Sequence, residues 1–290
     1  MTEGLIAVTG ATGHVGSRVA TRLAAKGARQ RLIVRDQSRA PAVDGAEISV
    51  ASGYMAGDEL RAALEGAHTV FLIPARESAI RVAEHISAID AAVAAGVERI
   101  VYLSFGGAAP DAIFTLARDH YATEQHIRTT GVPFTFLRMN IYLDFIPSMV
   151  TPAGVITGPA GEGRVAAVLR DDIADAAAAV LTSNGHDGKT YDLTGREAFT
   201  ATEAAALMSR ASGKPISFHN ESVEEAYASR AAYAAPDWEV AGWVTSYTAI
   251  AGGQLETVTN GVRRLAGHEP MTLAEYLDAH PESLDHVTSG

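Results

Sequence analysis

Short apolar runs alternate with longer amphipathic stretches through the first half of the chain. Each short run is continuously apolar, which is typical of strands buried on both faces of a parallel sheet. The longer stretches carry apolar side chains at helical spacing, as at Val15, Val19 and Leu23, and several end at a glycine. The expected strands span residues 5–9, 31–34, 46–50, 69–73, 99–103 and 133–137, and the expected helices span 14–27, 58–65, 78–95 and 113–130.

This alternation predicts an α/β protein with a doubly wound parallel Rossmann sheet, formed by residues 1–150. The rhythm then changes. A segment rich in glycine and proline (152–163) is followed by expected helices at 171–181 and 202–212 and expected strands at 189–193 and 215–219. A largely helical stretch from 223 to 264 follows, with an expected break at Gly252-Gly253. We expect residues 151–290 to form a smaller α+β substrate or lid domain, with the segment around 186–196 as the part that could return to the sheet.

Composition and charge narrow the function. The chain has 290 residues, 23 basic against 34 acidic side chains, a net charge of −11 and no cysteine. An acidic chain is not expected to have nucleic acid as its main partner. The lack of cysteine excludes disulfides, a thiolate nucleophile and thiolate metal sites. No signal sequence or membrane-spanning run is apparent, so we expect a cytoplasmic protein acting on a small molecule without a membrane partner. Homo-oligomerisation stays open.

A glycine-rich turn joins the first expected strand to the first expected helix. It reads Thr9-Gly10-Ala11-Thr12-Gly13-His14-Val15-Gly16, a G-x-x-G-x-x-G variant of the dinucleotide-binding fingerprint. Gly10 permits a tight turn, Gly13 lets the backbone approach a pyrophosphate, and Gly16 allows close packing of helix and strand. The helix dipole and free N–H groups favour phosphate there. The expected cofactor contacts are Gly10, Thr12, Gly13, His14, Val15, Gly16 and, at the end of the fourth strand, Ile73; the alternative is a structural turn without a ligand.

The end of the second strand is where the adenosine ribose of a dinucleotide lies. It reads Val34-Arg35-Asp36, with Arg39 just beyond. A carboxylate here accepts from the ribose 2′-OH of NAD, whereas arginine pairs with the 2′-phosphate of NADP. Arg35 and Arg39 favour NADP(H) as the cofactor. Asp36 keeps NAD(H) open, and for Arg39 a solvated surface charge is the alternative.

Several motifs beyond the turn carry a family resemblance. They are Val34-Arg35-Asp36, the run 137–142 (Leu-Arg-Met-Asn-Ile-Tyr), the glycine-containing segment 158–164, Arg170-Asp171-Asp172-Ile173-Ala174, and the segment 188–195. With these motifs the chain resembles the NmrA-like group of atypical short-chain dehydrogenases/reductases, and within it the type 2 NAD(P)H:quinone oxidoreductases and the triphenylmethane-reductase-like proteins. The resemblance implies a Rossmann domain, a small C-terminal domain and a substrate cleft between them.

The same resemblance points to candidate catalytic residues. The wider superfamily uses a serine at the end of the fifth strand and a Tyr-x-x-x-Lys pair, whose lysine lowers the tyrosine pKa and bonds the nicotinamide ribose. Here Ser104 has the serine position and Tyr121 the tyrosine position, but the lysine position is Gln125. The type 2 quinone reductases have His-x-x-x-x-Lys, read here as His120 through Gln125. Ser104, His120, Tyr121 and Gln125 are the catalytic candidates, with Ser104 and Gln125 also expected at the cofactor. The alternative for Tyr121 is a half-buried helix aromatic.

The remaining candidates concern substrate and metal. Asn140 and Tyr142 follow the sixth expected strand, at the sheet edge where such folds bind ligands, and are the substrate candidates. The alternative for both is a capped loop without a substrate role. Trp238 and Trp243 belong to an aromatic group on the expected lid helices, which either stacks on a planar substrate or is ordinary core. His120, Glu124 and His126 lack the spacing of a metal motif, so no metal is expected.

These observations favour an NAD(P)H-dependent oxidoreductase that transfers hydride to a flat conjugated acceptor such as a quinone. A quinone needs little help from an activated tyrosine, because its own ring stabilises the phenolate product. Positioning of the nicotinamide beside the acceptor then supplies most of the rate. Two alternatives remain: a non-enzymatic NAD(P)-binding redox sensor, which the absent lysine favours, and a biosynthetic reductase of imines or activated alkenes.

Overall fold

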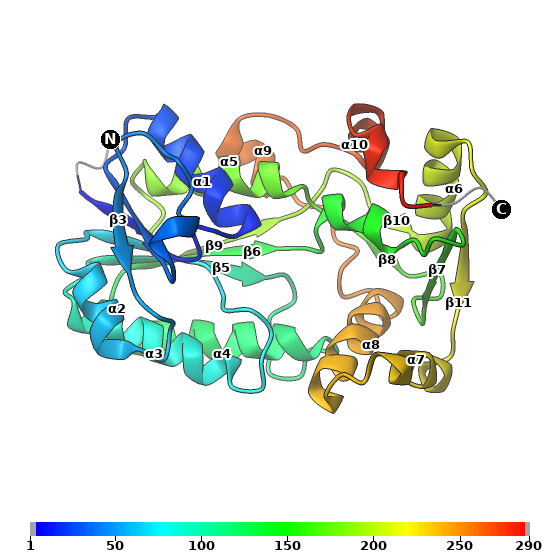
Figure 1. Cartoon of the computed structure of the whole chain (residues 1–290), viewed down its shortest axis with the longest axis horizontal. Helices are drawn as coiled ribbons and strands as arrows, with labels where there is room; N and C mark the ends of the chain where they lie inside the picture. Colours follow the sequence, from blue (N-terminus) through cyan, green and yellow to red (C-terminus); the bar gives the residue numbers. More distant parts are fainter. Residues whose placement is uncertain (1–3, 288–290) are drawn as a thin grey trace.

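The fold centres on one parallel sheet of seven strands in the order β3-β2-β1-β4-β5-β6-β9. A computed structural model describes residues 4–287 of the chain (Figure 1). The strands are β1 (Ile6–Val8), β2 (Gln30–Val34), β3 (Glu47–Val50), β4 (Thr69–Leu72), β5 (Arg99–Phe105), β6 (Phe134–Met139) and β9 (Lys189–Leu193). The predicted doubly wound α/β architecture is therefore confirmed.

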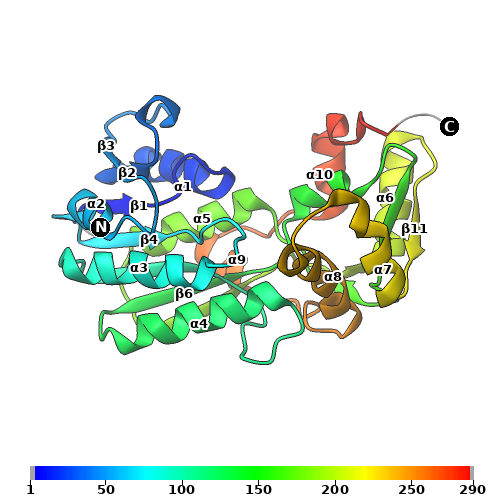
Figure 2. The same ribbon diagram turned by 60° about the horizontal axis from the view of Figure 1, so that its bottom comes forward.

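Helices cover both faces of the sheet, as Figures 1 and 2 show. One face carries α1 (His14–Ala25), α5 (Arg170–Leu181) and α9 (Gly261–Ala266), and the other carries α2 (Gly57–Leu64), α3 (Arg81–Ala94) and α4 (Thr115–Thr129). Successive side chains of a strand point to opposite faces. In β5, for example, Val101 and Leu103 belong to the first core and Tyr102 to the second. Continuous apolar strands thus supply two cores at once.

The chain beyond residue 150 does not stay in a separate lobe. Strand β9 pairs in parallel with β6, and α5 packs against α1. Arg18 and Arg22 of α1 hold Asp171 and Asp175 of α5 through ion pairs of 2.6–3.0 Å. Four alanines of α5 are fully buried, which lets this helix lie close to its neighbours. Part of the second half therefore completes the sheet domain.

The rest of the second half forms a small lobe beyond the carboxyl ends of β5 and β6 (Figure 1). Its two sheets each have two strands, β7 (Val155–Gly158) with β11 (Ser217–Asn220) and β8 (Arg164–Val165) with β10 (Phe199–Thr200). Its helices are α6 (Ala201–Ser212), α7 (Val223–Arg230), α8 (Asp237–Ala251) and α10 (Leu273–Ala279). The chain also contains 3₁₀ turns: η1 (Gln37–Arg39) follows β2 in the sheet domain, and the others are η2 (Leu143–Met149), η3 (Ala231–Tyr233) and η4 (Pro281–Leu284).

The lobe departs from the sequence expectation in three places. The glycine-rich segment 152–163 contains β7, which pairs with β11, and Gly158 lies so near the Tyr247 ring that a Cβ there would be 2.4 Å from a ring carbon. The expected helical stretch 223–264 breaks after α8 at the expected Gly252-Gly253, but it is also interrupted between α7 and α8, which was not expected. Helix α10 was not expected, although Thr272 and Glu275 form a capping box at its start. Within residues 4–287, no helix is both long and apolar enough to cross a membrane.

Candidate functional site

The glycine-rich turn between β1 and α1 folds back on itself. Gly10 has φ of 58°, and its carbonyl accepts from the Gly13 amide at 2.9 Å. A Cβ on Gly16 would lie 2.2 Å from the Gly10 oxygen, so a side chain does not fit there. No side chain caps the start of α1, and Thr12, Gly13 and His14 are exposed. The first amides of α1 are therefore open to an anion such as a pyrophosphate.

The loop after β4 is tied to this turn. The Thr9 hydroxyl donates to the Phe71 carbonyl at 3.1 Å and accepts from the Ile73 amide at 2.9 Å. The Tyr54 hydroxyl lies 2.7 Å from the Thr9 hydroxyl, and burial raises the pKa of this phenol. A Cβ on Gly10 would meet Ile73 at 3.3 Å. Half-buried Ile73 thus stands beside the glycine turn, where the sequence expects a cofactor contact.

Two arginines stand free at the end of β2. The Asp36 carboxylate accepts from the Ser38 amide at 2.9 Å and the Ser38 hydroxyl at 2.7 Å, and these hydrogen bonds lower its pKa. Arg35 and Arg39 are exposed, and within residues 4–287 neither guanidinium group makes a hydrogen bond or an ion pair, although the charge of Arg39 also helps to lower the pKa of Asp36. The carboxylate at this strand end is thus already engaged, whereas the two guanidinium groups are available to a phosphate.

A cavity of about 370 Å³ opens beyond the carboxyl ends of β5 and β6, between α4 and α8. Its wall is mostly aromatic and aliphatic, with a few charged groups. The lining residues are Glu77, Arg81, Phe105, Phe114, Leu116, His120, Met139, Asn140, Ile141, Tyr142, Phe145, Arg170, Gly242, Trp243 and Ser246. Phe105 and Phe114 meet edge to face at 5.1 Å. Such a wall suits a flat apolar ligand.

His120 forms part of the inner wall and is almost fully buried. Arg81 Nη2 lies 3.1 Å from His120 Nε2, and because a guanidinium only donates, Nε2 is the acceptor. The Nδ1–H then faces the Tyr102 hydroxyl at 2.8 Å. Burial, followed by the charge of Arg81, lowers the pKa of His120 well below its ordinary value. The ring is therefore neutral, and both of its nitrogens are engaged.

Ser104 lies at the end of β5 but points into the packing between β5 and α4. Its side chain is fully buried, and its hydroxyl donates to Glu124 Oε1 at 2.6 Å. Glu124 in turn accepts from Arg138 at 2.8 and 2.6 Å. Ser104 does not line the cavity. In this geometry it serves the packing of α4 on the sheet.

Tyr121 and Gln125 are not brought to the cavity. Helix α4 turns Leu116, His120 and Glu124 toward the sheet. Tyr121 is half-buried, Gln125 is exposed, and neither is a lining residue. The residues that α4 turns toward the sheet, His120 and Glu124, thus each precede by one position the residues that the sequence pattern selects, Tyr121 and Gln125.

Asn140 and Tyr142 both line the cavity. The Asn140 amide donates to the Leu255 carbonyl at 3.0 Å, and its oxygen accepts from the Ile141 amide at 2.7 Å. Asn140 therefore fixes the end of β6 to a distant segment. The Tyr142 ring is covered by the Arg170 guanidinium, 4.0 Å from its centroid.

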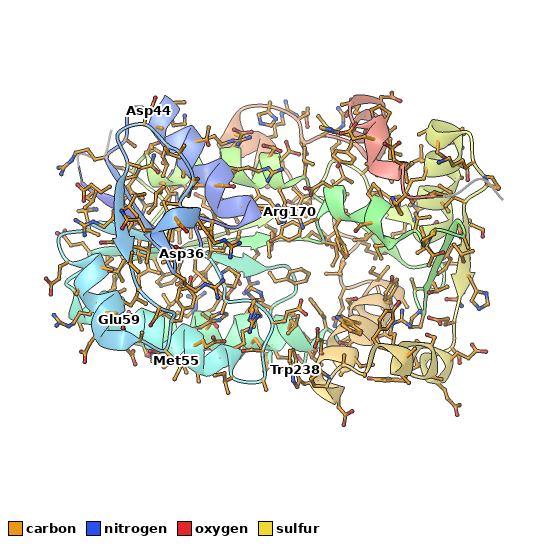
Figure 3. All side chains as sticks on the ribbon, viewed as in Figure 1. Asp36, Asp44, Met55, Glu59, Arg170 and Trp238 are labelled. Carbon is orange, nitrogen blue, oxygen red and sulfur yellow. The ribbon has the colours of Figure 1, made fainter. Side chains whose placement is uncertain are left out.

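The two tryptophans have different places. Trp243 of α8 lines the cavity and meets Tyr233 edge to face at 5.8 Å. Trp238 does not line it, and Figure 3 shows Trp238 at the lower margin of the molecule, well away from Arg170. Of the two, Trp243 is the one placed to touch a bound ligand.

Sequence reasoning did not single out several residues of the cavity. Arg81 belongs to no motif, and Arg170 begins the segment 170–174 that carries the family resemblance but had no expected role in a site. The places of both residues depend on how α3 and α5 pack. Phe105 directly follows Ser104, so its apolar ring at a strand end was a usable signal. In the part of the chain that the structure describes, no cluster of three or more histidine and acidic side chains could hold a metal.

Comparisons with known proteins agree with this geometry. The profile of a family described as NAD(P)H-binding matches residues 10–184. Quinone oxidoreductase 2 of Escherichia coli (strain K12) is 34% identical over 278 residues, covering 93% of this chain and 96% of that protein. A (4-alkanoyl-5-oxo-2,5-dihydrofuran-3-yl)methyl phosphate reductase of Streptomyces griseus is 36% identical over 290 residues, covering 96% and 99%.

Solved structures give the same result. The NADPH complex of the Escherichia coli quinone oxidoreductase QOR2 superposes with a TM-score of 0.87 at 33% identity, over 94% of this chain and 99% of that chain. The triphenylmethane reductase of Citrobacter sp. complexed with NADP(H) superposes with a TM-score of 0.84 at 32% identity, over 94% and 99%.

Proposed function

The chain belongs to the NAD(P)H-binding family, and we propose that it is an NAD(P)H-dependent oxidoreductase that reduces a planar conjugated acceptor such as a quinone. The observation that carries this proposal is the cavity of about 370 Å³ walled by Phe105, Phe114 and Trp243 at the carboxyl edge of the sheet. Relatives that cover 93% and 94% of the chain are named as a quinone oxidoreductase and a triphenylmethane reductase, which supports an acceptor of this kind.

The residues of the glycine-rich turn fit a dinucleotide. The close approach of Gly16 to Gly10 and the uncapped start of α1 leave backbone amides for the pyrophosphate. We assign Gly10, Thr12, Gly13, His14, Val15 and Gly16 to this role, with Ile73 beside the turn. When bound, the reduced nicotinamide supplies the hydride.

NADP(H) is the preferred cofactor in this proposal. Arg35 and Arg39 are free to pair with a 2′-phosphate, while Asp36 is engaged by Ser38 and is less available to a ribose hydroxyl. The two relatives with solved cofactor complexes bind NADPH and NADP(H), which supports the same choice. NAD(H) binding at lower affinity is compatible with this arrangement.

Proton transfer in this protein does not rest on a Tyr-x-x-x-Lys pair. Tyr121 and Gln125 lie off the cavity, and Gln125 cannot lower a phenol pKa by charge. The aromatic wall holds the acceptor flat and excludes water, so that orientation supplies most of the catalysis. We keep His120 and Asn140 as positioning residues: His120 orients the Arg81 guanidinium, and Asn140 holds the end of β6.

The test combines a nucleotide-binding titration with NADPH oxidation over a panel of quinones. Binding with quinone turnover supports the proposal. Nucleotide binding without turnover of any acceptor would instead favour the redox-sensor alternative. Two matched variants test whether the cavity binds the acceptor, because Trp243→Leu removes an aromatic ring from the cavity wall and Trp238→Leu does not. We expect at least a tenfold loss of kcat/KM for the first and little change for the second.

A further inference from the structure

One end of the cavity carries a phenol and a cation in contact. Tyr142 follows β6, and Arg170 is the first residue of α5. The guanidinium carbon of Arg170 lies 4.0 Å from the centre of the Tyr142 ring, and both residues line the cavity. Figure 3 shows Arg170 in the middle of the molecule, between the sheet and the C-terminal lobe. A cation over the face of a phenol attracts the ring and favours negative charge on its oxygen.

Both side chains are held in place by the surrounding backbone. Tyr142 forms a bridge with Val168, two residues before Arg170. The Val168 amide donates to the Ile141 carbonyl, and the Leu143 amide donates to the Val168 carbonyl, both at 2.9 Å. Arg170 Nη1 donates to Asp144 Oδ2 at 2.8 Å, with side-chain exposures of 15% and 11%. The pair is therefore preorganised.

The Tyr142 hydroxyl is a proton donor on a residue that lines the cavity. Within residues 4–287 this hydroxyl makes no hydrogen bond. It is not one of the fully buried polar atoms that lack a partner, so its oxygen keeps some accessible surface. Three other donors of the wall are in use: Asn140 donates to Leu255, Ser246 to the Trp243 carbonyl, and His120 to Tyr102. Arg81 Nη1 and the Trp243 indole N–H make no hydrogen bond within residues 4–287, but guanidinium and indole groups donate hydrogen bonds and do not act as general acids. Glu77 lines the cavity as well but is exposed at its rim.

Burial and the surrounding charges determine the protonation state of the Tyr142 phenol. Burial raises the pKa of Tyr142 to about 12, the Asp144 carboxylate acts in the same direction, and the cations of Arg170 and Arg81 act against it. The group is thus protonated at every ordinary working pH. The two cations reduce the cost of the transient phenolate when the proton leaves.

We propose that Tyr142, with Arg170 stacked on its ring, donates the proton to the acceptor oxygen, which would replace the missing Tyr-x-x-x-Lys pair. This inference rests on the proposed function. A quinone gains a hydride as NAD(P)H becomes NAD(P)⁺, and the resulting anion takes one proton as the Tyr142 O–H bond breaks. Solvent then returns a proton to Tyr142. The acceptors whose reduction would depend on Tyr142 are therefore those with a carbonyl oxygen.

The role of the proton separates two kinds of acceptor. A triphenylmethane dye cation such as crystal violet becomes a neutral molecule when hydride forms a C–H bond, so its reduction needs no proton. We expect Tyr142→Phe to lower kcat on 1,4-benzoquinone about a hundredfold, at the low end for a lost general acid because the quinone ring stabilises its own anion. Reduction of crystal violet should change less than about threefold. Arg170→Met should show the same selectivity with a smaller loss.

A solvent isotope effect tests the same step within one acceptor. Quinone reduction by the wild type should be slower in D₂O, and Tyr142→Phe should lose that difference. Tyr227→Phe is the matched control, because Tyr227 is an exposed tyrosine of α7 outside the cavity. Equal losses on both acceptors, or no loss on either, would overturn the proposal. So would a Glu77→Gln variant that loses the isotope effect while Tyr142→Phe keeps it.

A binding measurement keeps the inference separate from the proposed function. The chain has two tryptophans, so a Trp238→Phe background leaves Trp243 in the cavity wall as the fluorescent probe. Without any cofactor, Tyr142→Phe should weaken 1,4-benzoquinone binding about two- to tenfold, the value of one neutral hydrogen bond, and leave crystal violet binding unchanged. If the wild type reduces neither acceptor, the proposed function fails. This binding difference then decides whether Tyr142 contacts the carbonyl.

Discussion

Glu124 on α4 and Arg138 on β6 form a two-pronged ion pair, with carboxylate oxygens 2.8 and 2.6 Å from Nε and Nη2. Glu124 is fully buried, whereas the Arg138 side chain is 24% exposed. The pair fixes α4 against the sheet, and with it the wall that His120 contributes to the cavity. It also accepts the Ser104 hydroxyl, so that no member of the group is left without a partner.

Glu124→Gln should destabilise the fold because it leaves a guanidinium beside a neutral amide in a buried place. Breaking a buried pair costs about 3–5 kcal/mol, and the partial exposure of Arg138 places the expected loss at about 2–4 kcal/mol. Urea unfolding measures it. The control is Glu65→Gln, which removes the exposed Arg61–Glu65 pair and should cost about 0–1 kcal/mol. Equal losses would show that burial does not determine the strength of the pair.

The fold was predictable from sequence because a continuous apolar strand and an amphipathic helix leave distinct periodicities. The seventh strand, β9, has a less distinctive pattern because only Tyr191 and Leu193 are buried in it. Short elements such as β7 and α10 depend on contacts with distant segments.

The site was predictable from sequence only where its residues lie next to one another along the chain. The turn from Gly10 to Gly16 and the arginines after β2 act through positions adjacent in sequence. The inward side of α4 could not be read in this way, because adjacent helix residues differ by about 100° around the axis. A shift of one residue exchanges Tyr121 for His120. The contact of Tyr142 with Arg170 requires the tertiary fold.

Gly13→Val should abolish nucleotide binding and leave the protein folded. A Cβ at this position lies 3.2 Å from the Gly10 oxygen, which is tight but tolerable, while the branched side chain fills the space that a pyrophosphate needs. Calorimetric titration with NADPH and a thermal melt measure the two effects. Gly16→Ala is the contrast, since its Cβ would lie 2.2 Å from the same oxygen and should lower the melting temperature. Unchanged NADPH affinity in a folded Gly13→Val protein would remove the basis for the dinucleotide site.

Arg35→Ala should weaken NADPH binding about ten- to a hundredfold and change NADH binding little. The reason is the loss of a charge-assisted contact to the 2′-phosphate, worth about 1.5–3 kcal/mol. Dissociation constants for both cofactors check this. Arg210→Ala, at an exposed arginine of α6, is the control. If the wild type instead prefers NADH, Asp36 rather than Arg35 is the residue that contacts the adenosine ribose and selects the cofactor.

Tyr121→Phe and Gln125→Lys should each change quinone turnover by less than about threefold. Neither side chain lines the cavity, and Gln125 is exposed. A lost general acid would instead cost about 10²–10⁴-fold. The measurement is kcat on one quinone for both variants. A large loss of kcat in Tyr121→Phe would show that Tyr121 reaches the substrate in the complex. Tyr121 would then be the general acid, as the tyrosine is in the wider superfamily.

Two neighbouring aspartates of α5 should give opposite dependences of stability on pH. Burial raises the pKa of Asp172 from 3.8 to about 6, with Asp175 and Asp171 acting in the same direction and the Met271 amide and His268 against it. The folded state therefore binds a proton more tightly than the unfolded chain. The stability from this group is fully present below about pH 4 and is lost as pH rises through about 6. Asp172→Asn should make the melting temperature less dependent on pH between 4 and 7.

Asp171 is the matched contrast. Partial burial acts to raise its pKa, but hydrogen bonds and charges from Arg22 and Arg18 outweigh it, and the net pKa is lowered. Its stabilisation is present above its ordinary pKa of 3.8 and is lost as pH falls through the lower folded value. Asp171→Asn should therefore lower the melting temperature at pH 7 and have little effect at the acid end. Thermal melts of both variants across this range check the sign. If Asp172→Asn lost more stability at pH 7 than at pH 4, its carboxylate would be a favourable charge in the fold, contrary to the burial argument.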